Sequence, residues 1–197
     1  MDDAIITSIN STVGPNDSLA IIGDFCLAKR GSAIAAYRDY RSRIKCKNVH
    51  LVLGNHDDRE AALAVFATCG ETMMVRSDGH EFFLSHYPAR SWDRSNHGSI
   101  MLYGHVHGYF AAEDEGGASE ASCRQIKDGF ASALTKRGLD ANPELLNELL
   151  ATVNGSRRLL KTLDVGVDNL RPGMPFGTPW SAGEIVLQIA KRFRFGS

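Results

Sequence analysis

The sequence predicts a mixed α/β (α+β) fold, and two patterns support this class. In the first half, segments with helical spacing of apolar residues alternate with short apolar runs that are typical of buried strands. In the second half, strand-like runs follow one another more closely along the chain. With 197 residues the chain is long enough for one domain with a substantial core, so we expect residues 1–197 to form a single domain.

The elements of the first half are read from apolar periodicity and from the residues that stop helices. Residues 2–13 carry isoleucine and valine at near-helical spacing, and Gly14-Pro15 ends this helix. Ser32 can cap a second helix that runs to about Ile44. The other expected elements are strands over 19–22, 49–53 and 100–103, a helix over 59–68, and a hairpin of 73–76 with 81–85 joined at 77–80.

Residues 111–157 differ in character and are expected to form a helical insertion within the domain. Residues 111–119 are acidic and rich in glycine, which is typical of an exposed linker. Two helices are expected to follow, over 120–137 and 143–153, the second with Asn142 as its cap and Pro143 at its first position.

Two further elements are expected after the insertion. Residues 159–165 have the pattern of a strand. Ser181 and Glu184 have the spacing of a capping box, which predicts a helix over 182–192.

The composition is ordinary for a soluble globular protein, with 43% hydrophobic and 23% charged residues. A formal net charge of -1 gives no electrostatic argument for a membrane or nucleic-acid partner. A nucleic-acid partner is disfavoured but stays open, since a local basic pocket can exist in a neutral protein. No segment resembles a signal peptide or approaches the roughly 20 apolar residues of a membrane span, so a cytoplasmic location is expected. Four cysteines without Cys-x-x-Cys spacing are expected to be reduced thiols: Cys26, Cys46, Cys69 and Cys123.

Polar side chains follow the strand-like runs at four places. These are Asp24, Gly54-Asn55-His56-Asp57, His86 and Gly104-His105-Val106-His107. A rigid sheet can aim side chains at its strand ends toward one point. The mixture of Asp, Asn and His suits Mn, Fe or Zn and not a thiolate site, and a pair of such ions can clamp a phosphate ester and activate a water. The pattern therefore predicts a hydrolytic metal site.

Each segment taken alone also has a simpler interpretation. Asp24 could be a turn residue after a strand, and Asn55 or Asp57 could cap the helix that follows. His105 and His107 lie on the same side of an extended segment, so they could also form only a polar face.

In this order, the four segments resemble the calcineurin-like metallophosphoesterase family, and most closely its small bacterial and phage-type members. The resemblance covers about residues 1–110 and 158–190, including Leu163-Asp164-Val165-Gly166-Val167-Asp168-Asn169, and leaves the helical insertion outside. It implies a four-layered αββα sandwich with a two-metal centre at the carboxyl ends of its strands.

The resemblance also implies a ligand set. Asp24 would bridge two metal ions, and His107 would bind the second of them. Asn55, His86 and His105 would complete the protein ligands of the first ion.

Four other residues receive roles from the same resemblance or from their position. His56 would stand beside the leaving group and protonate or stabilise it, with Asp57 orienting the imidazole. Tyr87 and Arg90 follow a ligand histidine and could line the substrate pocket, although an exposed loop arginine is the commoner case.

The sequence departs from the family at its start. The family opens with a strand that ends in Asp-x-His, and no such motif occurs here; Met1-Asp2-Asp3 falls inside the family's first helix. We therefore expect the first strand to be missing, with one well-formed metal site and a second that keeps only Asp24 and His107. The start could be truncated, the protein could be a natural single-metal form, or Asp2, Asp3 or a partner chain could fill the gap. A homo-oligomer or a rearranged sheet could cover the apolar strand edge that this leaves open.

These observations lead us to expect a metal-dependent phosphoesterase, a hydrolase that acts on phosphodiesters or nucleotides through metal-activated water. The alternative is a degenerate or truncated relative with one metal and little activity, which acts by binding or assembly. A nuclease of the same superfamily is a third reading, and the near-neutral charge speaks mildly against extended nucleic-acid contacts.

Overall fold

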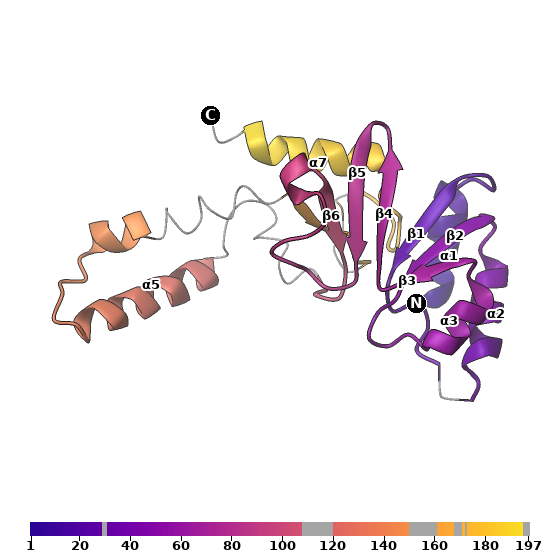
Figure 1. The fold of residues 1–197 in the computed structure, drawn as a ribbon, viewed down its shortest axis with the longest axis horizontal. Helices are drawn as coiled ribbons and strands as arrows, with labels where there is room; N and C mark the ends of the chain where they lie inside the picture. The colour runs from indigo at the N-terminus through magenta and orange to yellow at the C-terminus, as the bar shows by residue number, and fades with distance from the viewer. Residues whose placement is uncertain (29–30, 108–119, 150–160, 168–170, 172, 195–197) are drawn as a thin grey trace.

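The protein is a mixed α/β structure with two sheets (Figure 1). The computed structural model describes all residues except 29–30, 108–119, 150–160, 168–170, 172 and 195–197. Within these limits, the expected α+β class is confirmed.

The first sheet is parallel and is built by the first 70 residues. Its order is β1-β2-β3, and Ile22 of β1 pairs with Val52 of β2, which pairs with Gly70 of β3. The elements are α1 (Asp2–Thr12), β1 (Ser18–Ile22), α2 (Ala33–Arg43), β2 (Asn48–Val52), α3 (Arg59–Val65) and β3 (Thr68–Gly70). The helices cover one face, where Leu19 and Leu51 pack with Tyr37, because a parallel sheet in water must bury both faces.

The second sheet has the order β4-β5-β6-β7. Its strands are β4 (Thr72–Ser77), β5 (His80–Ser85), β6 (Ile100–Tyr103) and β7 (Thr162–Asp164). β4 and β5 form the expected antiparallel hairpin, whose turn holds Asp78 and Gly79 at φ 51° and 76°. β5, β6 and β7 run parallel, so their carboxyl ends lie at one edge of the sheet.

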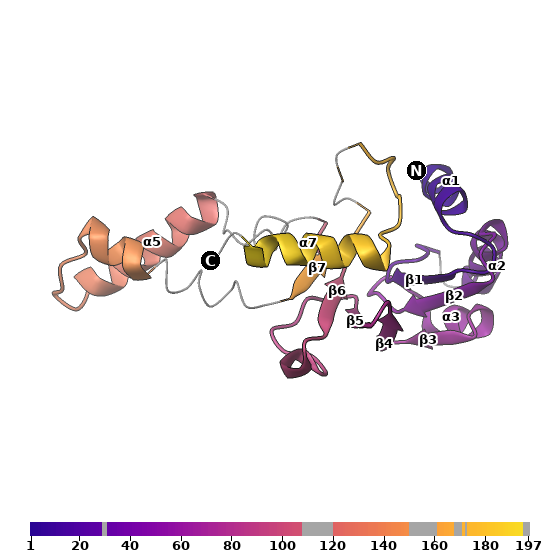
Figure 2. The ribbon, with the colours of Figure 1, turned by 90° about the horizontal axis from the view of Figure 1, so that it is seen from above.

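The two sheets share a core with the last helix, α7 (Ala182–Arg194). Val52 of the first sheet packs in one cluster with Leu84 and Leu102 of the second sheet and with Ile185 of α7. Figure 2 shows α7 lying along the second sheet. The opposite face of this sheet carries Met101, Tyr103 and the buried Trp92, which belongs to the segment between β5 and β6. The described elements thus show two sheets with helices and do not confirm a four-layered αββα sandwich.

The first helix contacts the segment that precedes the last helix. Ser8 of α1 donates a hydrogen bond through Oγ to the carbonyl of Phe176 at 2.7 Å. A Cβ at Gly177 would lie 2.9 Å from Ile5 Cγ1, so the segment before α7 lies directly against α1. This contact joins residues that are 168 positions apart.

The insertion contains two helices that contribute nothing to the three apolar clusters of the described residues. They are α5 (Glu120–Thr135) and a helix over residues 143–149, and both views place them away from the two sheets (Figures 1 and 2). Asn142 caps the second helix as expected, since its Oδ1 accepts from the Leu145 amide at 2.8 Å. The expected linker over 111–119 lies outside the described residues, and a division into one domain with an insertion stays a prediction.

Two observations on the described part of the chain bear on the composition. Cys26, Cys46 and Cys69 are free thiols. Among the helices that the structure describes, none is long and apolar enough to cross a membrane.

Candidate metal centre

The predicted ligands lie just beyond the carboxyl ends of strands from both sheets. Asp24 follows β1 and Asn55 follows β2, whereas His86 directly follows β5 and His105 follows β6. In layered α/β proteins, ligands commonly bind outside the carboxyl ends of parallel strands. The structure brings these four side chains together.

His86 is the centre of the group. Its side chain is 3% exposed, and three potential ligand atoms surround its Nε2. The Oδ1 of Asn55 lies at 3.0 Å, the Nδ1 of His105 at 3.2 Å, and the Oδ2 of Asp24 at 3.5 Å. The ligand atoms of Asp24, His86 and His105 all lie within 4.8 Å of one another.

The other ring nitrogen of His86 fixes which atom is free to bind an ion. Nδ1 lies 3.1 Å from the carbonyl oxygen of Ile22, and a carbonyl can only accept, so Nδ1 carries the proton. In a neutral imidazole this leaves a lone pair on Nε2, directed at the neighbouring oxygen and nitrogen atoms. A hydrogen bond from the second ring nitrogen to a carbonyl is how metal-binding histidines are usually oriented.

The spacing of these atoms fits a common ion. Two ligands about 2.1 Å from one ion lie about 3.0 Å apart at a right angle and about 3.4 Å apart at a tetrahedral angle. The three distances around His86 Nε2 run from 3.0 to 3.5 Å and so span this interval. Two imidazoles, an amide and a carboxylate suit Mn, Fe or Zn. The residues present therefore fit one divalent ion.

Close packing of two loops holds Asp24 in place. A Cβ at Gly23 would lie 2.0 Å from His86 Nδ1, and one at Gly54 would lie 2.2 Å from Asp24 Oδ1. Asp24 itself has φ 53°, and His105 has φ 65°. Left-handed conformations are unfavourable for residues with a side chain and tend to persist at functional sites, where the surrounding structure holds them.

His107 is also left-handed, with φ 49°, and is exposed. It is not among the residues whose ligand atoms converge with His86. Its predicted role at a second ion stays a prediction.

His56 and Asp57 differ from each other in their surroundings. The His56 amide donates to Asp24 Oδ1 at 3.0 Å, while the residue as a whole is exposed. Asp57 accepts from the Phe25 amide, the Tyr37 hydroxyl and the Gly54 amide at 2.8, 2.7 and 2.8 Å. The Asp57 carboxylate is thus engaged by the two loops and by α2, and its expected role in orienting the His56 imidazole stays a prediction.

Of the two pocket residues suggested by the sequence, only Tyr87 touches the cluster among the contacts that the structure describes. Its ring centroid lies 4.5 Å from that of His105 and 5.1 Å from that of His86, and the residue is 49% exposed. Arg90 is exposed on the following loop.

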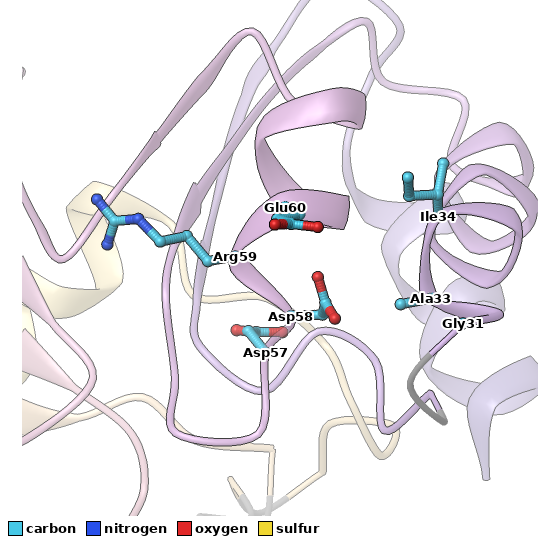
Figure 3. Close-up of a pocket in the computed structure, with 7 residues that line it drawn as sticks. All are labelled: Gly31, Ala33, Ile34, Asp57, Asp58, Arg59 and Glu60. Carbon is cyan, nitrogen blue, oxygen red and sulfur yellow. The ribbon is translucent and has the colours of Figure 1, made fainter.

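A hollow of about 460 Å³ opens between the starts of α2 and α3 (Figure 3). Its polar lining is mainly acidic, with Asp57, Asp58 and Glu60 beside Arg59, which is paired with Glu71. A phosphate ester is an anion, so this lining would repel it. We do not assign the hollow to a phosphate-ester substrate.

Sequence reasoning missed Tyr37, which lies on α2 and is fully buried. Its hydroxyl donates to Asp57 Oδ1 and accepts from the Asp58 amide at 3.0 Å. A tyrosine on a helix carries no local signal for such a contact, because the partner lies 20 residues further along the chain.

Comparisons with known proteins give little further information. No family model matches the sequence, and no curated protein matches it. The chain resembles the crystal structure of a protein of unknown function from Aquifex aeolicus, with 22% sequence identity and a TM-score of 0.42. The match covers 54% of this chain. It covers 64% of the Aquifex aeolicus protein, which is less than two thirds of that protein's length. A likeness of this size assigns neither a fold family nor an activity.

Proposed function

We propose that this protein is a metal-dependent phosphoesterase that hydrolyses phosphodiesters or nucleotides. The observation that carries the proposal is the convergence of Asn55, His105 and Asp24 on the Nε2 of His86 at 3.0 to 3.5 Å. The resemblance of the motifs to calcineurin-like metallophosphoesterases supports it, as does the position of the cluster at the strand ends. The four-layered sandwich of that family is part of the same proposal.

A divalent ion at this centre would polarise a phosphoryl oxygen and lower the pKa of a bound water. The protein side chains have separate tasks. Asn55 and His86 hold the ion and keep it electrophilic because both are neutral ligands, and Asp24 supplies a balancing negative charge. Tyr87 borders the cluster and is exposed enough to contact a substrate.

His56 is the proton donor to the leaving group in this proposal. Its backbone amide is anchored on Asp24 Oδ1, so its chain position is fixed next to the ligand set. Its side chain is exposed and therefore accessible to a substrate. An imidazole is suited to this task because it exchanges a proton near neutral pH.

One observation favours a second candidate, a single-metal relative that acts by binding or assembly. Within the described residues, no second group of His, Cys, Asp or Glu side chains converges as Asp24, His86 and His105 do. The two candidates share the metal site and differ in turnover.

Metal content and turnover, measured together, test both candidates. Tag-free protein is loaded with Mn or with Zn, dialysed and analysed by elemental analysis, and the same samples are assayed on a chromogenic phosphodiester. His86→Ala is the test variant, and His80→Ala, an exposed histidine at the start of β5, is the control. Bound metal with turnover that His86→Ala removes supports the enzyme. One metal without turnover supports the binding relative, and no metal refutes both.

A further inference from the structure

The Asp57 carboxylate ties together the two loops that carry the candidate ligands. Its Oδ1 accepts from the amide of Phe25, which follows Asp24. Its Oδ2 accepts from the amide of Gly54, which precedes Asn55. Beyond the paired strand ends, the Asp24 and Asn55 loops are therefore bridged by one side chain.

Tyr37 fixes this carboxylate from the outside. The residue is fully buried in the core that α2 shares with the first sheet, and its ring packs edge-on against Phe25 and Phe66 at 5.2 and 6.5 Å between centroids. Its hydroxyl donates to Asp57 Oδ1 at 2.7 Å and accepts from the Asp58 amide at 3.0 Å. The ring cannot turn away without disturbing the core, so the hydroxyl has one fixed position.

The protonation state of Tyr37 suits this role. Burial, followed by the hydrogen bond and charge of Asp57, raises the pKa of the Tyr37 hydroxyl above its usual value of 10.0. The hydroxyl therefore remains a donor across the working range of most enzymes.

We propose that Tyr37 is a positioning residue that, through Asp57, holds the Asp24 and Asn55 loops at the separation that a bound metal ion requires. The inference rests on the proposed metal site and adds to it a residue from a helix that supplies no ligand. Without the hydroxyl, Asp57 Oδ1 keeps one donor and the Asp58 amide loses its acceptor. The loops then relax, and the ligand atoms no longer match one ion.

The chain offers a matched pair of variants. Tyr37→Phe removes the buried hydroxyl and keeps the ring. Tyr40→Phe, three residues further along α2, removes a hydroxyl that donates to Asp2 Oδ2 at 2.6 Å in an exposed position. Both variants break one tyrosine–carboxylate hydrogen bond and keep the ring packed near Phe25, but only the Tyr37 hydroxyl bonds to Asp57, which bridges the ligand loops.

Metal affinity and amide exchange are the two measurements. Calorimetric titration of metal-free protein with Mn or Zn should show affinity about 10- to 100-fold weaker in Tyr37→Phe, the usual effect of losing a partner behind the ligands. The control Tyr40→Phe should stay within about twofold of the wild type. In the metal-free protein, the Phe25 and Gly54 amides should exchange faster with solvent in Tyr37→Phe than in either of the others.

The outcomes separate this inference from the proposed function. Unchanged metal affinity in Tyr37→Phe overturns the inference and leaves the metal site standing. If the melting temperature falls while the affinity is unchanged, Tyr37 is a packing residue and the inference is also overturned. A wild type that binds neither ion refutes the metal site and the inference with it. If Tyr37→Phe does not fold, Asp57→Asn gives the same test, because the new side-chain NH2 group must face a backbone donor on one of the two loops. Wild-type metal affinity in Asp57→Asn overturns the inference.

Discussion

Gly54 has no room for a side chain, which gives a sharp test of the centre. In Gly54→Ala the new Cβ would lie 2.2 Å from Asp24 Oδ1 and 2.4 Å from the Asp24 backbone nitrogen. Non-bonded carbon contacts are normally about 3.5 Å, so the Asp24 backbone must retreat by about 1 Å. Rotation of the Asp24 side chain cannot relieve the contact between the new Cβ and the Asp24 backbone nitrogen. The backbone is also restrained, because the next residue, Phe25, is held by Asp57.

The size of the effect follows from this displacement. Metal–ligand distances vary by only about 0.2 Å, so a shift of about 1 Å takes Asp24 out of the ligand set. Loss of that charged ligand should weaken metal binding by at least about tenfold, or about 1.4 kcal/mol. Overpacking of this kind costs about 1 to 3 kcal/mol of folding stability. For a chain of this size, that lowers the melting temperature by about 2 to 12 °C.

Thermal unfolding of metal-free protein and calorimetric titration with Zn measure the two effects separately. The control is Gly183→Ala in the first turn of α7, where an added Cβ meets nothing within 4 Å. This control should keep its metal affinity and gain up to about 1 kcal/mol, because alanine favours a helix over glycine. If Gly54→Ala binds Zn as tightly as the wild type does, Asp24 is not a ligand in the way proposed.

The remaining predictions concern the ligand set, the proton donor and the response to acid. His86→Ala and Asn55→Ala should abolish tight metal retention in elemental analysis while His107→Ala has a smaller effect; equal losses would indicate a completed two-metal site. His56→Ala should keep its metal but lower turnover of a chromogenic phosphodiester by about 10²-fold or more, as loss of a general acid does, and unchanged turnover would remove His56 from the mechanism. Burial favours a higher pKa for Glu184, but hydrogen bonds from Ser181 and the charge of Arg171 outweigh it and hold the pKa below its usual 4.5. Glu184 therefore stabilises the fold above about pH 4.5 and loses this contribution as the pH falls through its lower folded pKa. Urea denaturation between about pH 5 and 3 should therefore show a steeper loss of folding stability in the wild type than in Glu184→Gln. Parallel curves for the two proteins would contradict this assignment.

The elements that the sequence predicted correctly are those with a local cause. The hairpin turn depends on Asp78-Gly79, two residues that tolerate positive φ, and both adopt it. The start of α7 depends on Ser181 and Glu184, whose side chains and amides form the expected capping box.

The strand β3 was not predicted, and the helix before it is shorter than expected. Thr68-Cys69-Gly70 shows no alternation and becomes a strand because it pairs with β2, where His50 faces Thr68. A three-residue strand that depends on a partner distant in sequence gives no periodic signal. α3 therefore ends at Val65 instead of near residue 68.

The candidate ligands could be predicted from the sequence, whereas the residues that hold their loops in place could not. Asp24, Asn55, His86 and His105 follow strand ends, and the sheet geometry alone brings strand ends together. The partners of Asp57 depend instead on the rotation of α2 about its axis and on the packing of the Tyr37 ring in the core. Those quantities are set by the whole fold.

The contact between α1 and the segment before α7 also bears on how the chain is made. Ser8 leaves the ribosome before its partner Phe176, which is synthesised 168 residues later. At about 5 to 20 residues per second, this interval is roughly 8 to 34 seconds. During that time α1 can pack its Ile9 on the first sheet while its side toward residues 176–177 stays in water. A nascent chain halted before Phe176 should therefore expose α1 to proteases that the finished protein resists.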